Sequence, residues 1–112
     1  MALADPPPLE IDPARLAELR AAGAPLAILD VREPWELAIC GFPDAIQIPL
    51  GRLPGREAEL PDDRLIVVVC HHGRRSRLAT EHLRRSGRER TTNLAGGVDE
   101  WAQHVEPEMP RY

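Results

Sequence analysis

The sequence predicts an α/β domain built around a mostly parallel β-sheet. Two apolar, β-branched runs, Leu26–Arg32 and Arg64–Cys70, alternate with segments of helical pattern. The spacings between the apolar runs are too long for tight hairpins. A chain of 112 residues that is 43% hydrophobic also fits one domain with a single core. We therefore expect one domain over residues 1–112, with its core at about 9–104 and tails at 1–8 and 105–112.

The first segments carry clear start and stop signals. After the proline-rich lead-in "PPPLE", Asp12 is expected to be the N-cap of a helix and Pro13 its first residue, while Gly23 ends it. The next run, Leu26–Arg32, is continuously apolar until its charged end. That pattern is typical of a strand buried on both faces of a parallel sheet.

The middle of the chain predicts two short helices around a second strand. A helix begins at Pro34 in "PWELAI", and the strand lies in "DAIQIPL", where Pro49 ends it. The stretch "GRLPGREAELP" predicts another short helix that is interrupted or begun around Pro54. The strongest strand pattern follows in "RLIVVVC".

The last third predicts a helix, a strand and a closing helix. The helix "RLATEHLRRSG" is expected to end near Gly87 and to bury one face, which consists of Leu78, Ala79, His82 and Leu83. The stretch "TTNLAGGVDEWAQHV" then predicts a strand, a Gly-Gly turn and a short helix.

Cys70 lies directly between the most apolar strand and a basic helix. The carboxyl ends of parallel strands are where α/β sheets bind ligands, and the first amides of a helix have no intrahelical partners. Residues 64–90 hold eight arginines and two acidic residues in a chain of net charge −4. Such surroundings favour the nucleophilic thiolate, and Gly73 allows the backbone to approach the sulfur closely. We therefore predict that Cys70 is a reactive nucleophile.

Other roles of Cys70 stay open on the residues alone. It could be a small buried hydrophobe, or it could form a disulfide with Cys40, although two cysteines make no disulfide framework. A metal site is disfavoured because Cys70, His71 and His72 are consecutive and cannot readily wrap one tetrahedral ion. We expect neither a metal nor a cofactor, and we regard His82 and His104 as ordinary helix residues.

Four motifs resemble the rhodanese family of sulfurtransferases, specifically its single-domain type. The loop "CHHGRRS" matches the active-site pattern C-x-x-G-x-R-[ST/A]. The stretches "ILDVREPWE", "CGFPDAIQIP" and "NLAGGVDEW" are similar to the family's LLDVRExxE, GHIPGAIxIP and NLxGGxxxW. The resemblance covers almost the whole chain, roughly Leu9 to Trp101. The usual His and second Gly are missing from residues 41–45, which bears on local packing more than on activity.

The resemblance implies a rhodanese-like fold, a mostly parallel five-stranded sheet flanked by helices on both faces. It implies that Cys70 takes sulfane sulfur from a donor such as thiosulfate, holds it as a persulfide, and passes it to cyanide, a thiol or a protein. The substrate-binding residues would be His71, His72, Gly73, Arg74, Arg75 and Ser76.

The loop residues have separate expected roles. Their amides would surround the persulfide, and Arg74 or Arg75 would orient an anionic donor. Ser76 is expected to cap the helix as its N-terminal residue, a role at least as well supported as a catalytic one. The remaining charged residues near a strand end are expected to be architectural: Asp30, Arg32, Glu33 and Glu36.

Two other functions remain open. The protein could be a sulfur-carrier or regulatory module that accepts persulfide from a protein partner. A Cys-dependent phosphatase or arsenate reductase is disfavoured, because related phosphatases place the Arg six positions after the Cys, where this chain has Ser76. We expect no nucleic-acid or membrane partner. The lack of a signal-like N-terminus favours the cytoplasm, and the oligomeric state does not follow from the residues.

Overall fold

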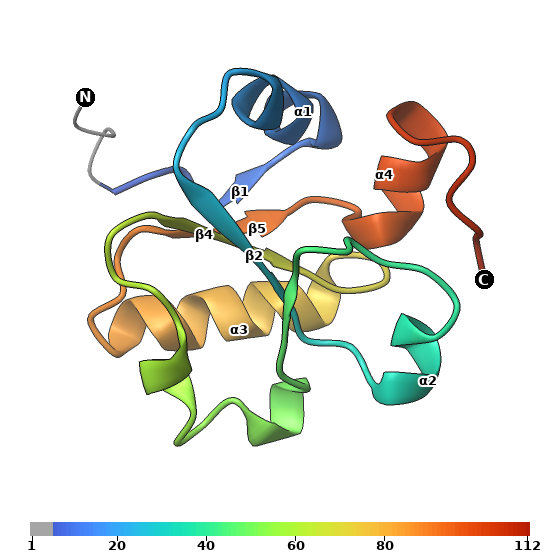
Figure 1. Ribbon diagram of the computed structural model, residues 1–112. Coiled ribbons are helices and arrows are strands. Elements are labelled where there is room, and N and C mark those ends of the chain that lie inside the picture. The colour runs from blue at the N-terminus through green and yellow to red at the C-terminus, as the bar shows by residue number, and fades with distance from the viewer. Residues whose placement is uncertain (1–5) are drawn as a thin grey trace.

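The structure of the protein is a computed structural model that describes residues 6–112 (Figure 1). The first five residues of the predicted N-terminal tail lie outside these described residues. The elements follow in the order β1 (Glu10–Ile11), α1 (Pro13–Ala21), β2 (Leu26–Asp30), α2 (Pro34–Leu37), β3 (Ile46–Gln47), the 3-10 helices η1 (Leu50–Arg52) and η2 (Glu57–Glu59), β4 (Leu65–Val69), α3 (Arg74–Arg85), β5 (Thr91–Leu94) and α4 (Gly97–His104).

All five strands form one parallel sheet. Their order is β1-β5-β4-β2-β3, so the most apolar strand, β4, lies in the centre. Its neighbour β2 pairs with it over its whole length, from Leu26 opposite Leu65 to Asp30 opposite Val69. The carboxyl ends of the two strands therefore meet at one edge of the sheet. The predicted α/β class with a five-stranded parallel sheet is confirmed.

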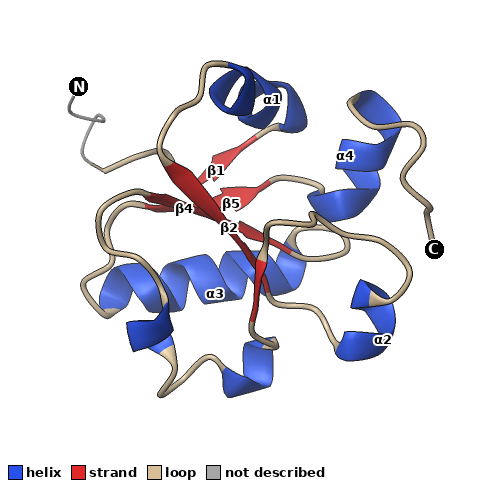
Figure 2. Cartoon of the chain, viewed as in Figure 1, coloured by secondary structure: helices blue, strands red, loops and turns tan. Residues whose placement is uncertain are grey.

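Helices cover both faces of the sheet, with α1 and α4 on one side and α3 on the other (Figure 2). Successive strand residues point to opposite faces. Val67 and Val69 therefore join the core that contains Trp101 of α4. Val68 and Cys70 join the second core, which contains Leu83 of α3. Cys70 is thus directed towards the face that α3 covers.

The structure corrects the predicted buried face of α3. Leu78 was expected on that face, but it is 56% exposed. The buried residues of the helix are Ser76, Ala79, Thr80 and Leu83. Two polar residues fit there because each hydroxyl has a partner: that of Thr80 donates to the carbonyl of Ser76 at 2.8 Å, and that of Ser76 contacts Asn93 Oδ1. Hydrophobicity alone therefore predicted the wrong orientation of α3 about its own axis relative to the sheet.

The 3-10 helices also refine a prediction. Residues 51–61 were expected to form a short helix around Pro54, and two single 3-10 turns flank that proline instead. Between residues 6 and 112, no helix is long and apolar enough to cross a membrane.

Residues 105–112, which we call the C-terminal strap, follow α4 to the C-terminus (Figure 1), and several of their side chains pack against the domain. Met109 is 5% exposed and belongs to the core beside Trp101. Arg111 pairs with Asp99 of α4 at 2.9 Å. The strap thus brings Tyr112 back to the carboxyl end of the sheet, where its hydroxyl contacts Arg32.

A fully buried ion pair closes the carboxyl end of β2. Arg32 and Asp30 are both 0% exposed and are joined at 2.8 Å. Burial by itself would lower the pKa of Arg32, but the hydrogen bonds with Asp30 and Tyr112 outweigh it and raise the pKa. Arg32 also donates to the carbonyl of Cys40 at 2.7 Å. The pair therefore anchors the segment that follows α2 as well as β2 itself.

We predict that Asp30→Asn destabilises the protein strongly. The substitution leaves the buried Arg32 guanidinium without its counter-charge, which costs about 3 to 5 kcal/mol. Urea unfolding at pH 7 measures the change. The matched control is Asp44→Asn, which removes an exposed pair with Arg20 and should cost about 1 kcal/mol or less. Equal, small losses in the two variants would contradict the structural role of the buried pair.

Candidate active site

The sulfur of Cys70 sits inside a ring of hydrogen-bond donors. The amides of Gly73 and Ser76 lie 3.1 and 3.3 Å from Sγ, and the Ser76 hydroxyl oxygen lies 3.2 Å from it. Cys70 is only 1% exposed, so water competes little for these donors. Donors that converge on one atom in a dry site stabilise negative charge there. This arrangement suits a thiolate, the nucleophilic form of cysteine.

Glycines make the tight loop after Cys70 sterically possible. Gly73 has φ +96° and is the N-cap of α3, and a Cβ there would lie 2.9 Å from the amide nitrogen of Gly96. Gly97 has φ +61°, and its Cβ would lie 2.4 Å from the carbonyl oxygen of Cys70. Both positions require glycine because of the backbone conformation and the close approach. The Gly-Gly turn therefore packs directly on the cysteine loop.

The first amides of α4 hold that loop from outside. Val98 donates to the carbonyl of Cys70 at 2.9 Å, and Asp99 donates to that of His71 at 3.1 Å. These amides have no partners within their own helix. The loop carbonyls are thereby turned towards α4, which leaves the amides of Gly73 and Ser76 directed at the sulfur.

Ser76 does not cap α3, contrary to the sequence prediction. Gly73 is the N-cap, and Ser76 lies in the first turn with a fully buried side chain. Its hydroxyl contacts both Cys70 Sγ and Asn93 Oδ1. One hydroxyl proton can serve only one acceptor at a time, so its direction depends on the charge of the sulfur. Asn93 fixes the loop further by donating to the Gly73 carbonyl at 3.0 Å.

The two arginines of the loop have different surroundings. Arg75 binds Glu36 of α2 through two bonds of 2.7 and 2.8 Å. These bonds with Arg75 are the main reason that the pKa of Glu36 falls to about 2, against the opposing effect of its burial. The bond with Glu36 likewise raises the pKa of Arg75. Within residues 6–112, Arg74 makes no ion pair, and its side chain is exposed.

Three rings are stacked beside the loop. His71 lies between His72 and Tyr112, with both ring-to-ring distances at 3.8 Å. Burial, followed by the nearby His72, lowers the pKa of His71. Its Nε2 atom is buried and has no hydrogen-bond partner. These facts favour the neutral imidazole.

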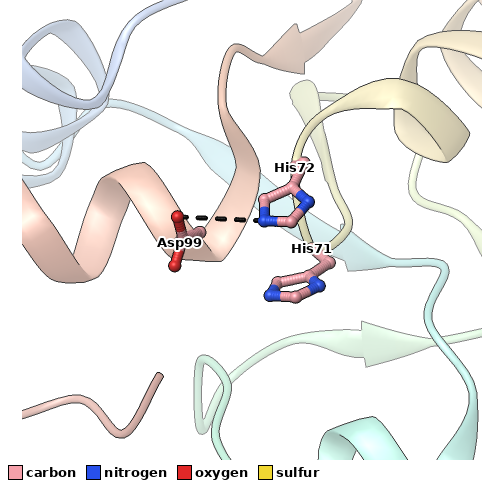
Figure 3. A group of neighbouring side chains, drawn as sticks. All are labelled: His71, His72 and Asp99. Atoms are coloured by element: carbon pink, nitrogen blue, oxygen red, sulfur yellow. Dashed lines mark ion pairs between the residues drawn. The ribbon is translucent and has the colours of Figure 1, made fainter. Parts of the chain in front are cut away.

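His71, His72 and Asp99 lie close enough together to be considered as metal ligands (Figure 3). Their ligand atoms lie within 4.8 Å of one another. The two imidazoles are stacked almost parallel, however, so their lone pairs do not converge on one point. Arg111 already binds Asp99 and is the main cause of its lowered pKa. The arrangement suits an ion pair between His72 and Asp99, 3.8 Å apart, better than a metal ion.

Most of these contacts involve the residues predicted from the motifs. The structure brings Cys70, Gly73, Ser76 and both loop arginines together at one end of the sheet. Sequence reasoning missed the parts played by Asn93 and Tyr112. Asn93 opens the closing motif "NLAGGVDEW", so a signal for it was present. Tyr112 lies outside every motif and carried no signal.

We predict that Glu36→Gln destabilises the protein by about 2 kcal/mol at pH 7, since it removes the charge from two strong hydrogen bonds. The pKa of Glu36 is about 2 in the folded protein, below its ordinary value of 4.5. Its contribution is therefore complete above about pH 4.5 and is lost as the pH falls towards 2. Urea unfolding should show a similar gap between wild type and variant at pH 7 and 5, and a smaller gap at pH 3. A pH-independent gap would contradict this interpretation, and the exposed Glu89→Gln is the control.

Comparison with known proteins identifies the family of the chain. The family model of the Rhodanese-like domain matches residues 12–104. A sulfurtransferase of Allochromatium vinosum is 39% identical over 98 residues, which cover 88% of this chain and 92% of the relative. The adenylyltransferase and sulfurtransferase uba4 of Ogataea parapolymorpha is 33% identical over 96 residues, covering 85% of this chain but only 24% of the relative.

Solved structures show the same fold. The rhodanese-related protein of Thermoplasma volcanium has a TM-score of 0.78 and 34% identity, with 88% of this chain and 94% of that chain covered. The family match covers well over half of the chain, and the similarity includes the cysteine loop. The chain therefore belongs to the rhodanese-like domain family of sulfur-transferring proteins.

Proposed function

We propose that this protein is a sulfurtransferase that carries sulfane sulfur on Cys70 as a persulfide, with thiosulfate or a similar anion as donor. One observation carries the proposal. The buried sulfur of Cys70 faces the amides of Gly73 and Ser76, an environment that stabilises a sulfur anion. Cys40 is the other cysteine among residues 6–112, and its sulfur has one donor, Arg32 Nη1 at 3.8 Å, and no backbone amide.

The proposed reaction is balanced without an oxidant or reductant. The Cys70 thiolate attacks the outer sulfur of thiosulfate, a new S–S bond forms, and the electron pair of the old S–S bond leaves with sulfite. A thiol acceptor in its thiolate form, or cyanide, then attacks the outer sulfur of the persulfide. That second bond breakage returns the electron pair to Cys70. The loop amides stabilise the sulfur anion at the beginning and end of each step.

Arg74 is the better of the two arginines for attracting the donor. Both terminal nitrogens of Arg75 donate hydrogen bonds to Glu36, and the two opposite charges largely cancel. Arg74 is exposed at the first position of α3, and no carboxylate within residues 6–112 pairs with it. An exposed guanidinium beside the loop attracts the sulfonate end of thiosulfate electrostatically. We assign Arg75 to holding the loop against α2.

A second candidate is a module that accepts persulfide from a protein and passes it on. The support is that a relative named for two activities, uba4, contains this domain as about a quarter of its length. The same Cys70 chemistry serves both candidates, and only the donor differs. Either reaction needs a free thiol, which both cysteines are. We accordingly place the protein in a reducing compartment, as the cytoplasm is.

We predict that incubation with thiosulfate adds one sulfur atom to the protein at Cys70 and releases one equivalent of sulfite. Intact-protein and peptide mass spectrometry detect the adduct. Cys70→Ser should abolish it, whereas the matched control Cys40→Ser should load sulfur normally.

A wild-type protein that gains no sulfur from thiosulfate but does so from a persulfidated protein would select the second candidate. Sulfur gain in Cys70→Ser equal to that of wild type would overturn both. Turnover of an aryl phosphate that depends on Cys70 would instead support phosphatase chemistry.

We also predict that Arg74→Gln raises KM for thiosulfate by about fivefold or more, since it removes a charge worth about 1 kcal/mol to an anion. The kcat value should change less, because the amides that face the sulfur are those of Gly73 and Ser76, which the substitution leaves in place. The control is Arg77→Gln, an exposed arginine one turn further along α3. Equal KM values for the two variants would exclude Arg74 as the donor-attracting residue.

A further inference from the structure

Tyr112 connects the two ends of the catalytic loop, although the proposed reaction does not use it. Its ring stacks on His71, directly after Cys70, and its hydroxyl binds Glu36, which holds Arg75. The loop between these contacts supplies the amides that face the sulfur. A single side chain of the C-terminal strap therefore contacts the loop at its beginning and, through Glu36, at its end.

The hydroxyl of Tyr112 joins two buried charges. It accepts a hydrogen bond from Arg32 Nη1 at 2.8 Å and donates one to Glu36 Oε2 at 2.8 Å. The other contacts of Arg32 Nη1 are long, at 3.5 and 3.8 Å. Burial, the largest cause, raises the pKa of Tyr112 to about 12, so the hydroxyl keeps its proton at neutral pH. It can therefore act as acceptor and donor at once.

The ring of Tyr112 covers the face of His71 that lies opposite His72. The two rings are 3.8 Å apart and 9° from parallel, and Trp35 packs edge-on against Tyr112 at 5.9 Å. The charged or titratable groups that face His71 are His72, Asp99 and Glu36 together with Tyr112 itself. The Tyr112 ring thus keeps water from the imidazole and limits its movement.

We propose that Tyr112 is a positioning residue for sulfur transfer, which holds the catalytic loop closed around Cys70 by stacking on His71 and by fixing Glu36 against Arg75. This inference rests on the proposed function of Cys70 for its kinetic consequence, but its structural part does not. The hydroxyl and the ring act on different ends of the loop. Two substitutions separate the contributions of the hydroxyl and the ring. Phenylalanine keeps the ring and removes the hydroxyl, whereas leucine removes both.

Displacement of reacting groups by about 1 Å can cost about a hundredfold in rate. Tyr112→Phe leaves Arg32 Nη1 without a close partner and frees one bond to Glu36. We expect it to slow sulfur loading from thiosulfate about three- to tenfold. Tyr112→Leu also removes the stacking, and we expect it to slow loading about tenfold or more. Stopped-flow measurement of sulfite release in a single turnover gives the rate per folded molecule.

The second readout is the pKa of His71, measured by NMR titration. Tyr112→Leu exposes the imidazole to water, so its pKa should rise towards the ordinary 6.5. Tyr112→Phe keeps the stacking and should leave that pKa at its wild-type value. The control Glu108→Gln changes an exposed side chain of the same strap and should alter neither readout.

The outcomes separate this inference from the proposed function. If wild type releases no sulfite from thiosulfate, the donor assignment fails, and the titration alone then decides whether Tyr112 shields the loop. If wild type loads sulfur and both Tyr112 variants load it at the wild-type rate, the positioning role is overturned. An unchanged His71 pKa in Tyr112→Leu would likewise overturn the stacking part, whatever the rates.

Discussion

The proposed chemistry of this protein depends on two backbone amides that point at one buried sulfur. Gly73 and Ser76 donate to Cys70 Sγ, and the loop can take that shape only because Gly97 lets α4 approach the carbonyl of Cys70. The parallel sheet supplies the rest, since its central strand ends at the cysteine and α3 begins four residues later. The same backbone geometry therefore determines both the shape of the loop and the proposed reactivity of Cys70.

A chain of ion pairs and hydrogen bonds lies along one side of that loop. Asp30 binds Arg32, Tyr112 joins Arg32 to Glu36, and Glu36 binds Arg75. These contacts link the end of β2, the helix α2, the C-terminal strap and the start of α3. Buried charges are tolerated when each has partners, and removing one leaves its neighbour uncompensated. The same contacts that satisfy these charges fix the position of the loop Cys70–Ser76.

Local patterns predicted much of this structure, and long-range contacts account for what they missed. The buried strand before Cys70 and the loop Cys70–Ser76 follow from residues that are neighbours in the sequence. The prediction that Leu78 is buried was wrong because the hydrophobic pattern does not indicate that hydrogen bonds allow Ser76 and Thr80 to be buried instead. The bonds from Arg75 to Glu36 and from Arg32 to Tyr112 span 39 and 80 residues. Only the folded arrangement brings such groups together.

The most direct test of this account is a crystal structure of the protein after exposure to thiosulfate. We expect one additional sulfur atom bonded to Cys70 Sγ, within hydrogen-bonding distance of the amides of residues 71–76. An additional sulfur that points to solvent, with no loop amide within reach, would contradict the claim that the loop stabilises the sulfur anion. A fully loaded crystal in which the loop amides have turned away would contradict it equally.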